Sequence, residues 1–263
     1  MPEFSSYAHG TPCWVDVTST DFDATIEFYK AFFGWEAEQE SRPEAGGYTR
    51  FSLNGKFVAA GAPARKEGTP AHWTTFIASD DVDETARRVR DAGGIVVMDP
   101  FDVFDAGRMT VAQDPTGAAF GVWQAGTMRG AELANEPGTF TWNECQTAEP
   151  ETAAAFYEAV FGHEVGEMPG ASGQLYRMLK VDDKAVAGIL ELTPEMKAGG
   201  VPANWSTIFA VEDTEEALRR AGELGGETLM GPMDIPAVGV LGVIKDPVGA
   251  VFQVIAPPKK ITQ

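Results

Sequence analysis

Apolar and polar residues alternate along the chain in a pattern that predicts short strands joined by amphipathic helices. Residues 13–17 form a short apolar run, which is typical of a strand. Asp21 then stands where a helix N-cap is expected, and apolar residues follow at helical spacings, namely Phe22, Ile26, Tyr29 and Phe33. Gly34 is expected to end this helix, because glycine readily adopts the left-handed conformation that closes many helices.

A second unit of the same kind follows the segment 63–70, which carries prolines at both ends. Residues 74–78 predict its strand, and Asp81 and Glu84 have the spacing of a capping box ahead of a second helix. Three more strands are then expected, at residues 95–98, 109–113 and 119–123. The sequence Asp-Pro-Thr-Gly at 114–117 predicts a tight turn that joins the last two strands as a hairpin.

The same order of motifs appears twice. Three early pairs share one constant offset along the chain: Trp14 with Trp142, Phe28-Tyr29 with Phe156-Tyr157, and Phe33-Gly34 with Phe161-Gly162. Three later pairs share a second, slightly larger offset: Trp73 with Trp205, Asp81 with Asp213, and the turn at Asp114 with the one at Asp246. The chain is therefore a duplication, which we divide into a first half (residues 1–128) and a second half (residues 129–263), each with two βαβββ units.

Composition narrows the class of protein. The formal charge of −19 disfavours nucleic acid and anionic membranes as partners. No apolar run is long enough to span a bilayer, and the N-terminus does not have the pattern of a signal peptide. Cys13 and Cys145 do not occupy matching repeat positions, so we expect two buried free thiols in a reducing compartment, and hence a cytoplasmic protein.

Three signatures, each present in both halves, resemble the vicinal oxygen chelate superfamily, which includes glyoxalase I, extradiol dioxygenases and bleomycin-sequestering proteins. They are Phe-Tyr-x3-Phe-Gly at residues 28–34, the Asp-capped helix that ends in Gly93-Gly94, and Asp-Pro-x-Gly before the last strand. The resemblance covers nearly the whole chain and is closest to tandem glyoxalase-like bacterial proteins, often loosely called hydroxylases. It implies an α+β fold in which the two βαβββ units of each half form a curved mixed sheet around a cleft.

Metal-dependent members of that superfamily bind a divalent ion with His, Glu or Gln side chains from the first and last strands of the units. Carried over by position, those sites fall in this chain near Trp14, Thr74 and Gly121 in the first half, and near Trp142, Ser206 and Gln253 in the second. This set is poor in metal ligands. Of the three histidines, His9 lies in the N-terminal arm, His163 is expected to be exposed, and only His72 lies near a ligand position. We therefore expect no bound metal; zinc, nickel, manganese or iron held by Asp16, His72 and a third group is the alternative.

Strand alternation adds the remaining candidates. If Val15 and Val17 face the helices, Trp14 and Asp16 face the cleft, and Trp142 and Glu144 do so in the second half. Asp16 and Glu144 are the candidate catalytic groups, either as proton-transfer bases or as anchors for a ligand; a structural hydrogen-bond partner is the alternative for both. The candidate ligand-binding side chains are Trp14, His72, Thr74, Arg108, Trp123, Trp142, Asn204, Ser206 and Gln253. Arg108 has no counterpart in the second half, where Val240 stands, and a solvent-facing salt bridge is its alternative role.

Two functions are consistent with these residues. The first is a metal-free protein that binds a small, aromatic or amphipathic organic molecule in a cleft. The second is an enzyme, which would be a glyoxalase-like lyase or a dioxygenase-type oxidoreductase with an unusual metal site or a carboxylate base. The poor ligand set favours the first. The sequence allows a monomer or a homodimer.

Overall fold

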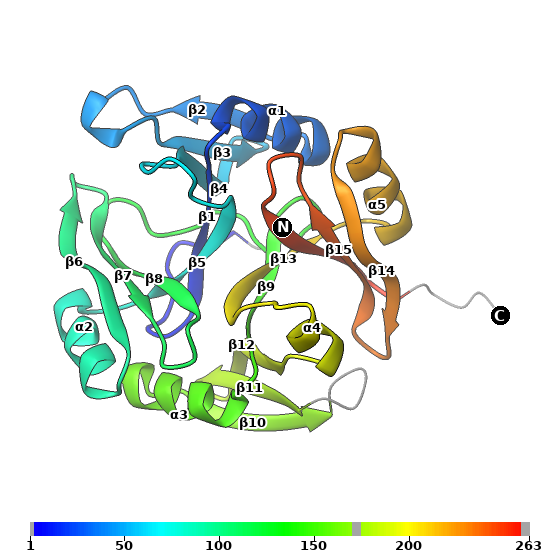
Figure 1. The fold of residues 1–263 in the computed structure, drawn as a ribbon. Helices are drawn as coiled ribbons and strands as arrows, with labels where there is room; N and C mark the ends of the chain where they lie inside the picture. The colour runs from blue at the N-terminus through cyan, green and yellow to red at the C-terminus, as the bar shows by residue number, and fades with distance from the viewer. Residues whose placement is uncertain (1–2, 170–174, 259–263) are drawn as a thin grey trace.

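A computed structural model describes residues 3–169 and 175–258, and within them each half of the chain folds around one mixed sheet of eight strands (Figure 1). The first sheet has the order β2-β3-β4-β1-β5-β8-β7-β6. Its elements are β1 (Pro12–Ser19), α1 (Phe22–Phe33), β2 (Glu36–Gln39), the 3-10 helix η1 (Pro43–Ala45), β3 (Thr49–Leu53), β4 (Lys56–Pro63), β5 (His72–Ala78), α2 (Val82–Asp91), β6 (Ile95–Val103), β7 (Gly107–Gln113) and β8 (Ala119–Ala125).

The second sheet repeats this order as β10-β11-β12-β9-β13-β16-β15-β14. Its elements are β9 (Phe140–Thr147), α3 (Pro150–Phe161), β10 (Glu164–Pro169), β11 (Leu175–Val181), β12 (Lys184–Glu191), α4 (Pro194–Ala198), β13 (Asn204–Ala210), α5 (Thr214–Glu223), β14 (Glu227–Ile235), β15 (Gly239–Lys245) and β16 (Val251–Ala256). In both sheets the first strands of the two units pair antiparallel at the centre, β1 with β5 and β9 with β13. The α+β tandem fold expected from the sequence is confirmed.

The helices begin where their capping residues predict. The carboxylate of Asp81 accepts a hydrogen bond from the Glu84 backbone N–H at 2.9 Å, and Asp213 caps α5 through Glu216 in the same way at 3.0 Å. Gly34 closes α1 in the left-handed conformation, with φ of 74°. The short helix α4 lies between the two units of the second half, where the sequence predicted no helix. None of the helices in the described part of the chain is long and apolar enough to cross a membrane.

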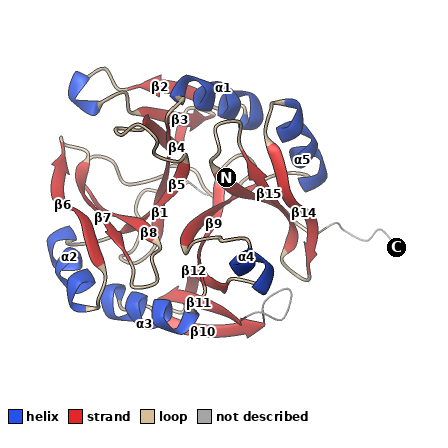
Figure 2. Ribbon diagram, viewed as in Figure 1, coloured by secondary structure: helices blue, strands red, loops and turns tan. Residues whose placement is uncertain are grey.

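Helices α1, α2, α3 and α5 lie at the periphery and the strands lie inside, whereas α4 lies on the inner side of the second sheet (Figure 2). The long helix of the first unit in each half lies against the long helix of the second unit in the other half, α1 beside α5 and α3 beside α2.

We call these two helix contacts, α1 with α5 and α3 with α2, the seams. At each seam a buried tyrosine forms a hydrogen bond to the other half. The Tyr29 hydroxyl of α1 donates to the carboxylate of Asp246 in the second half at 3.0 Å, and the Tyr157 hydroxyl of α3 donates to Asp114 in the first half at 2.9 Å. Each tyrosine in turn accepts from a tryptophan of its own half, Trp73 at 2.8 Å and Trp205 at 2.7 Å. The turns that the sequence predicted as simple hairpins are therefore also parts of the interface between the halves.

His163 is buried, with 2% of its surface exposed, so the prediction that it is exposed was wrong. The N-terminal arm causes this burial. Residues 3–11 cross onto the second half, and the backbone carbonyl of Gly10 lies 2.7 Å from the Nε2 atom of His163. Burial lowers the pKa of His163 below its usual value, which favours a neutral ring.

Candidate functional site

Three central strands of the second sheet bring Glu144, Ser206 and Gln253 together. Glu144 on β9 lies directly opposite Ser206 on β13, and Gln253 lies on β16, which pairs with β13. The Gln253 amide Nε2 donates to the Ser206 hydroxyl oxygen at 2.8 Å and to the Glu144 Oε1 atom at 3.2 Å. All three side chains are at least nine-tenths buried. We call these three residues the floor cluster.

Neighbouring side chains supply further hydrogen bonds to the Glu144 carboxylate. The Gln146 amide donates to Oε1 at 2.9 Å, and the Tyr176 hydroxyl donates to Oε2 at 3.2 Å. The indole N–H of Trp142 donates to the Tyr176 hydroxyl at 2.7 Å, and burial raises the pKa of Tyr176 so that the hydroxyl keeps its proton. The carboxylate thus has three hydrogen-bond donors from the protein, and a carboxylate can accept about four.

A cavity of about 1290 Å³ lies over the floor cluster, and we call it the second-half cavity. Its volume exceeds the roughly 300–1,000 Å³ typical of sites for drug-sized molecules. Most of its wall is apolar. Several elements contribute methionines, whose unbranched side chains are flexible, namely Met168, Met178, Met196, Met230 and Met233. The segment that contains α4 contributes to the wall through Met196, Val201 and Pro202. The polar floor and apolar walls suit a large organic molecule with one polar edge.

Six of the residues selected from the sequence line this cavity: His72, Trp142, Glu144, Asn204, Ser206 and Gln253. His72 reaches it from the first half, with its Nδ1 atom 2.9 Å from the Pro70 carbonyl oxygen. Sequence reasoning missed Gln146 and Tyr176. Both carried a usable signal, since Gln146 is two positions from Glu144 on the same face of a strand, and Tyr176 matches Tyr48 at the offset of the early repeat pairs.

The first half builds a similar but smaller polar group from Trp14, Asp16 and Tyr48. The Asp16 Oδ1 atom accepts from the Trp14 indole N–H at 2.7 Å and from the Tyr48 hydroxyl at 3.1 Å. Burial raises the pKa of the Asp16 carboxyl to about 7, and the two hydrogen bonds only partly offset that effect. Thr74 lies opposite Asp16 on β5, as Ser206 lies opposite Glu144.

The third floor position differs between the halves. Gly121 stands in the first sheet where Gln253 stands in the second, and Phe76 stands beside it where Ile208 stands. A Cβ atom on Gly121 would lie 2.2 Å from the Phe76 ring, so the ring occupies the space that the Gln253 side chain would need. Phe76 is buried in the same apolar cluster as Trp14 and Trp123. The Trp123 indole N–H donates to the Met128 carbonyl at 3.0 Å.

We expect Gly121→Ala to lower the free energy of unfolding by about 1–3 kcal/mol, because the added methyl group overpacks Phe76. The double variant Gly121→Ala with Phe76→Ile introduces the smaller residue that stands at this position in the second half. It should recover most of the lost free energy of unfolding. Urea unfolding of the wild type and both variants measures the effect. Equal losses in the single and double variants would show that Phe76 is not what closes the position.

Arg108 has carboxylate partners of its own. Its guanidinium forms ion pairs with Asp83 in the first turn of α2 at 2.8 Å and with Asp102 on β6 at 2.9 Å. These partners raise the pKa of Arg108 and lower that of Asp83. The structure therefore places Arg108 in the salt bridge that the sequence left open as its alternative role.

Comparisons with known proteins agree with this fold. The family model described as the glyoxalase/bleomycin resistance protein/dioxygenase superfamily matches residues 13–122, and the glyoxalase-like domain matches residues 142–255. "Putative glyoxylase CFP32" of Mycobacterium tuberculosis (strain CDC 1551 / Oshkosh) is 47% identical over 261 residues, which cover 98% of each chain.

The chain belongs to the glyoxalase/bleomycin resistance protein/dioxygenase superfamily. A second relative, "Anthracycline biosynthesis protein DnrV" of Streptomyces peucetius, is 41% identical and covers 95% of this chain and 94% of its own length. The Mn(II)-bound glyoxalase from Novosphingobium aromaticivorans superposes with a TM-score of 0.65 at 18% identity, over 95% of this chain and 83% of that one. The 2,3-dioxygenase LapB from Pseudomonas sp. KL28 superposes at 0.66 with 13% identity, over 96% and 94%. These two structures support the fold alone.

The metal that the superfamily implies does not fit the donor set at the floor cluster. Glu144 is its one carboxylate, and the Gln253 amide directs an N–H toward both Glu144 and Ser206. In the first half the third position is a glycine covered by Phe76. In residues 3–169 and 175–258, no group of three or more His, Cys, Asp or Glu side chains is placed to hold a metal ion. The floor cluster is thus a network of hydrogen bonds in the second half.

Proposed function

We propose that this protein binds one large, flat and mostly apolar organic molecule in the second-half cavity, and that it does so without a divalent metal. The observation that carries the proposal is the combination of a 1290 Å³ cavity with a compact polar floor. A ligand of one ring would leave much of the apolar wall in contact with water. A molecule of three or four fused rings would cover it and gain the hydrophobic free energy of that burial.

The floor cluster defines the polar edge of the ligand. Glu144 retains room for about one further donor, so it would accept a hydrogen bond from a ligand hydroxyl. The Ser206 oxygen accepts from Gln253, which leaves the Ser206 hydroxyl hydrogen to donate to a ligand carbonyl. Ser206 and Glu144 are directly paired across two strands, so their side chains are neighbours. The expected ligand therefore carries a hydroxyl next to a carbonyl on an aromatic frame. The anthracycline biosynthesis name of one relative is consistent with this chemistry.

The test is the binding of 1,8-dihydroxyanthraquinone, measured by titration calorimetry and by quenching of tryptophan fluorescence. We expect Glu144→Gln to weaken binding by about 10- to 100-fold, because a hydrogen bond to a charged group contributes about 1.5–3 kcal/mol. Asp16→Asn is the matched control, since it removes the corresponding carboxylate in the first half and should leave the affinity unchanged.

A one-ring analogue, 2-hydroxyacetophenone, carries the same polar edge and should bind more weakly than the anthraquinone. Equal affinities of the two compounds would contradict the proposed use of the apolar wall. An unchanged affinity in Glu144→Gln would contradict the role of the floor cluster.

An enzymatic function is the second candidate, favoured by the "glyoxylase" name of the 47% identical relative. In that case Glu144 would take up a proton from a substrate held at the floor, beside the donors Tyr176 and Gln253. Assay of the methylglyoxal–glutathione adduct, with and without added Ni²⁺ or Mn²⁺, separates the two functions. Turnover that is lost in Glu144→Gln would favour the enzyme, and binding without turnover would favour the proposal above.

A further inference from the structure

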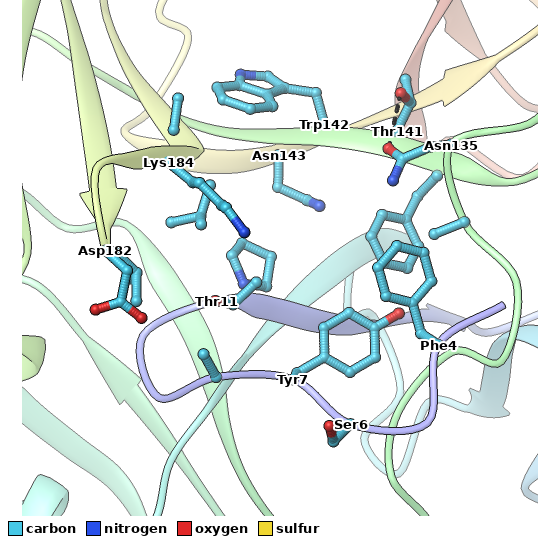
Figure 3. Close-up of a pocket in the computed structure, with 17 residues that line it drawn as sticks. Phe4, Ser6, Tyr7, Thr11, Asn135, Thr141, Trp142, Asn143, Asp182 and Lys184 are labelled. Carbon is cyan, nitrogen blue, oxygen red and sulfur yellow. Dashed lines mark hydrogen bonds between the residues drawn. The ribbon is translucent and has the colours of Figure 1, made fainter. Parts of the chain in front are cut away.

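A second, smaller pocket of about 310 Å³ lies between the N-terminal arm and the start of β9 and β12 (Figure 3). We call it the arm pocket. It shares the wall residues Asn135, Thr141 and Trp142 with the second-half cavity, so the two spaces are neighbours. Its volume is at the lower end of the range for small-molecule sites, roughly 300–1,000 Å³, and it suits a compound of one ring.

One end of the arm pocket offers hydrogen-bond donors. Asn143 is 1% exposed, and its Oδ1 atom accepts from the Thr75 hydroxyl at 2.8 Å. Figure 3 shows its Nδ2 atom directed into the pocket, where the amide N–H groups can donate to a ligand. Lys184 also extends its ammonium group toward the centre of the pocket (Figure 3), and no ion pair holds it in the described part of the molecule. An ammonium group and an amide N–H both donate hydrogen bonds, so this end of the pocket suits a ligand with a negatively charged acceptor.

The other end is aromatic. Phe4 and Tyr7 of the arm stack with ring centroids 5.3 Å apart (Figure 3), and Phe140 of β9 also lines the pocket. The Tyr7 hydroxyl donates to the Ala131 carbonyl at 2.8 Å, which fixes this ring over the pocket. The surface that a ligand ring would meet at this end is therefore made of ring faces and edges.

We propose that the arm pocket is a second binding site, separate from the cavity of the proposed function, for a small single-ring aromatic carboxylate. The ligand carboxylate lies between the Lys184 ammonium and the Asn143 amide, and its ring lies against Phe4, Tyr7 and Phe140. Asp182 also lines the pocket but turns its carboxylate away from the centre (Figure 3). The net charge of −19 acts against an anion, but at physiological salt charges farther than about 8 Å are largely screened.

The probe is benzoate, and its binding is followed by ligand-observed NMR. Lys184→Met should weaken benzoate binding about tenfold, because it removes a charge-assisted hydrogen bond. Lys184→Arg keeps the charge and should retain most of the affinity. Lys66→Met makes the same charge change in an exposed loop of the first half and should have no effect. Benzamide, which lacks the charge, should bind more weakly than benzoate and respond less to Lys184→Met.

The two sites can be told apart with the Glu144→Gln variant, which should weaken binding of 1,8-dihydroxyanthraquinone and leave benzoate binding unchanged. No benzoate binding up to the solubility limit would overturn the arm-pocket proposal without affecting the larger cavity. An unchanged benzoate affinity in Lys184→Met would overturn it as well. So would displacement of bound benzoate by direct competition with the anthraquinone.

Discussion

Asp114→Ala is expected to lower the free energy of unfolding by about 3–5 kcal/mol, the largest effect we predict for a single substitution. The Asp114 carboxylate is 2% exposed and accepts hydrogen bonds from the Thr116 backbone at 2.8 Å, the Ala118 backbone at 3.0 Å and the Tyr157 hydroxyl at 2.9 Å. Removal of the carboxylate leaves these donors without their acceptor inside the protein. An unsatisfied buried donor costs about 1–3 kcal/mol, so the losses add to several kcal/mol.

Urea unfolding followed by circular dichroism measures this loss. Asp246→Ala, at the equivalent turn, should behave similarly, because Asp246 accepts from the Val248 and Ala250 backbones and from Tyr29. Tyr157→Phe removes one donor to Asp114 and also the acceptor of the Trp205 indole N–H, so it should cost less than Asp114→Ala, about 1–3 kcal/mol. An Asp114→Ala protein within about 1 kcal/mol of the wild type would mean that the seam between the halves contributes little to stability.

Asp16→Asn should make the protein more stable at pH 8 and leave it nearly unchanged at pH 4. The folded state raises the pKa of Asp16 to about 7, so the folded protein holds this proton more tightly than the unfolded chain, whose carboxyl titrates near pH 4. The stabilising effect is complete below about pH 4 and is lost as the pH rises toward 7. The full difference is about 2–4 kcal/mol. An asparagine keeps the oxygen that accepts from Trp14 and Tyr48, so the variant removes only the titration.

The measurement is the free energy of unfolding of both proteins at pH 4, 6 and 8. Asp183→Asn, at an exposed turn, controls for the change of net charge. The difference between Asp16→Asn and the wild type should grow from pH 4 to pH 8, whereas the control should show no such growth. Parallel pH profiles for all three proteins would mean that Asp16 titrates in the folded state as it does in the unfolded chain.

Much of the fold follows from local sequence. The two nearly equal offsets between matching motifs predicted the duplication, and the caps at Asp81 and Asp213 were found where the spacing placed them. Strand alternation also selected Glu144, Ser206 and Gln253, because side chains two positions apart on a strand share a face whatever the tertiary structure.

The remainder depends on contacts between residues distant in the sequence. The room for a side chain at the third floor position is set by one neighbour on the adjacent strand, Phe76 in the first half and Ile208 in the second. His163 was expected at the surface because it follows the end of a helix, and the arm that buries it lies 153 residues earlier in the chain. The partners of Arg108 on α2 and β6 likewise could not be predicted from local sequence, because Asp83 lies 25 residues before Arg108 in the chain.

Each seam contains a hydrogen bond from a tyrosine of one half to an aspartate of the other half. These bonds limit how far the sequences of the two halves can diverge. The first half, in which Phe76 fills the third floor position, cannot simply be deleted, because its turn at Asp114 still supplies the acceptor for Tyr157 of the other half. The seams therefore keep both copies under selection for folding, while the cleft floors are free to change separately. In a duplicated chain of this kind, one half can lose its binding site and keep its fold, while the site of the other half changes to bind a new ligand.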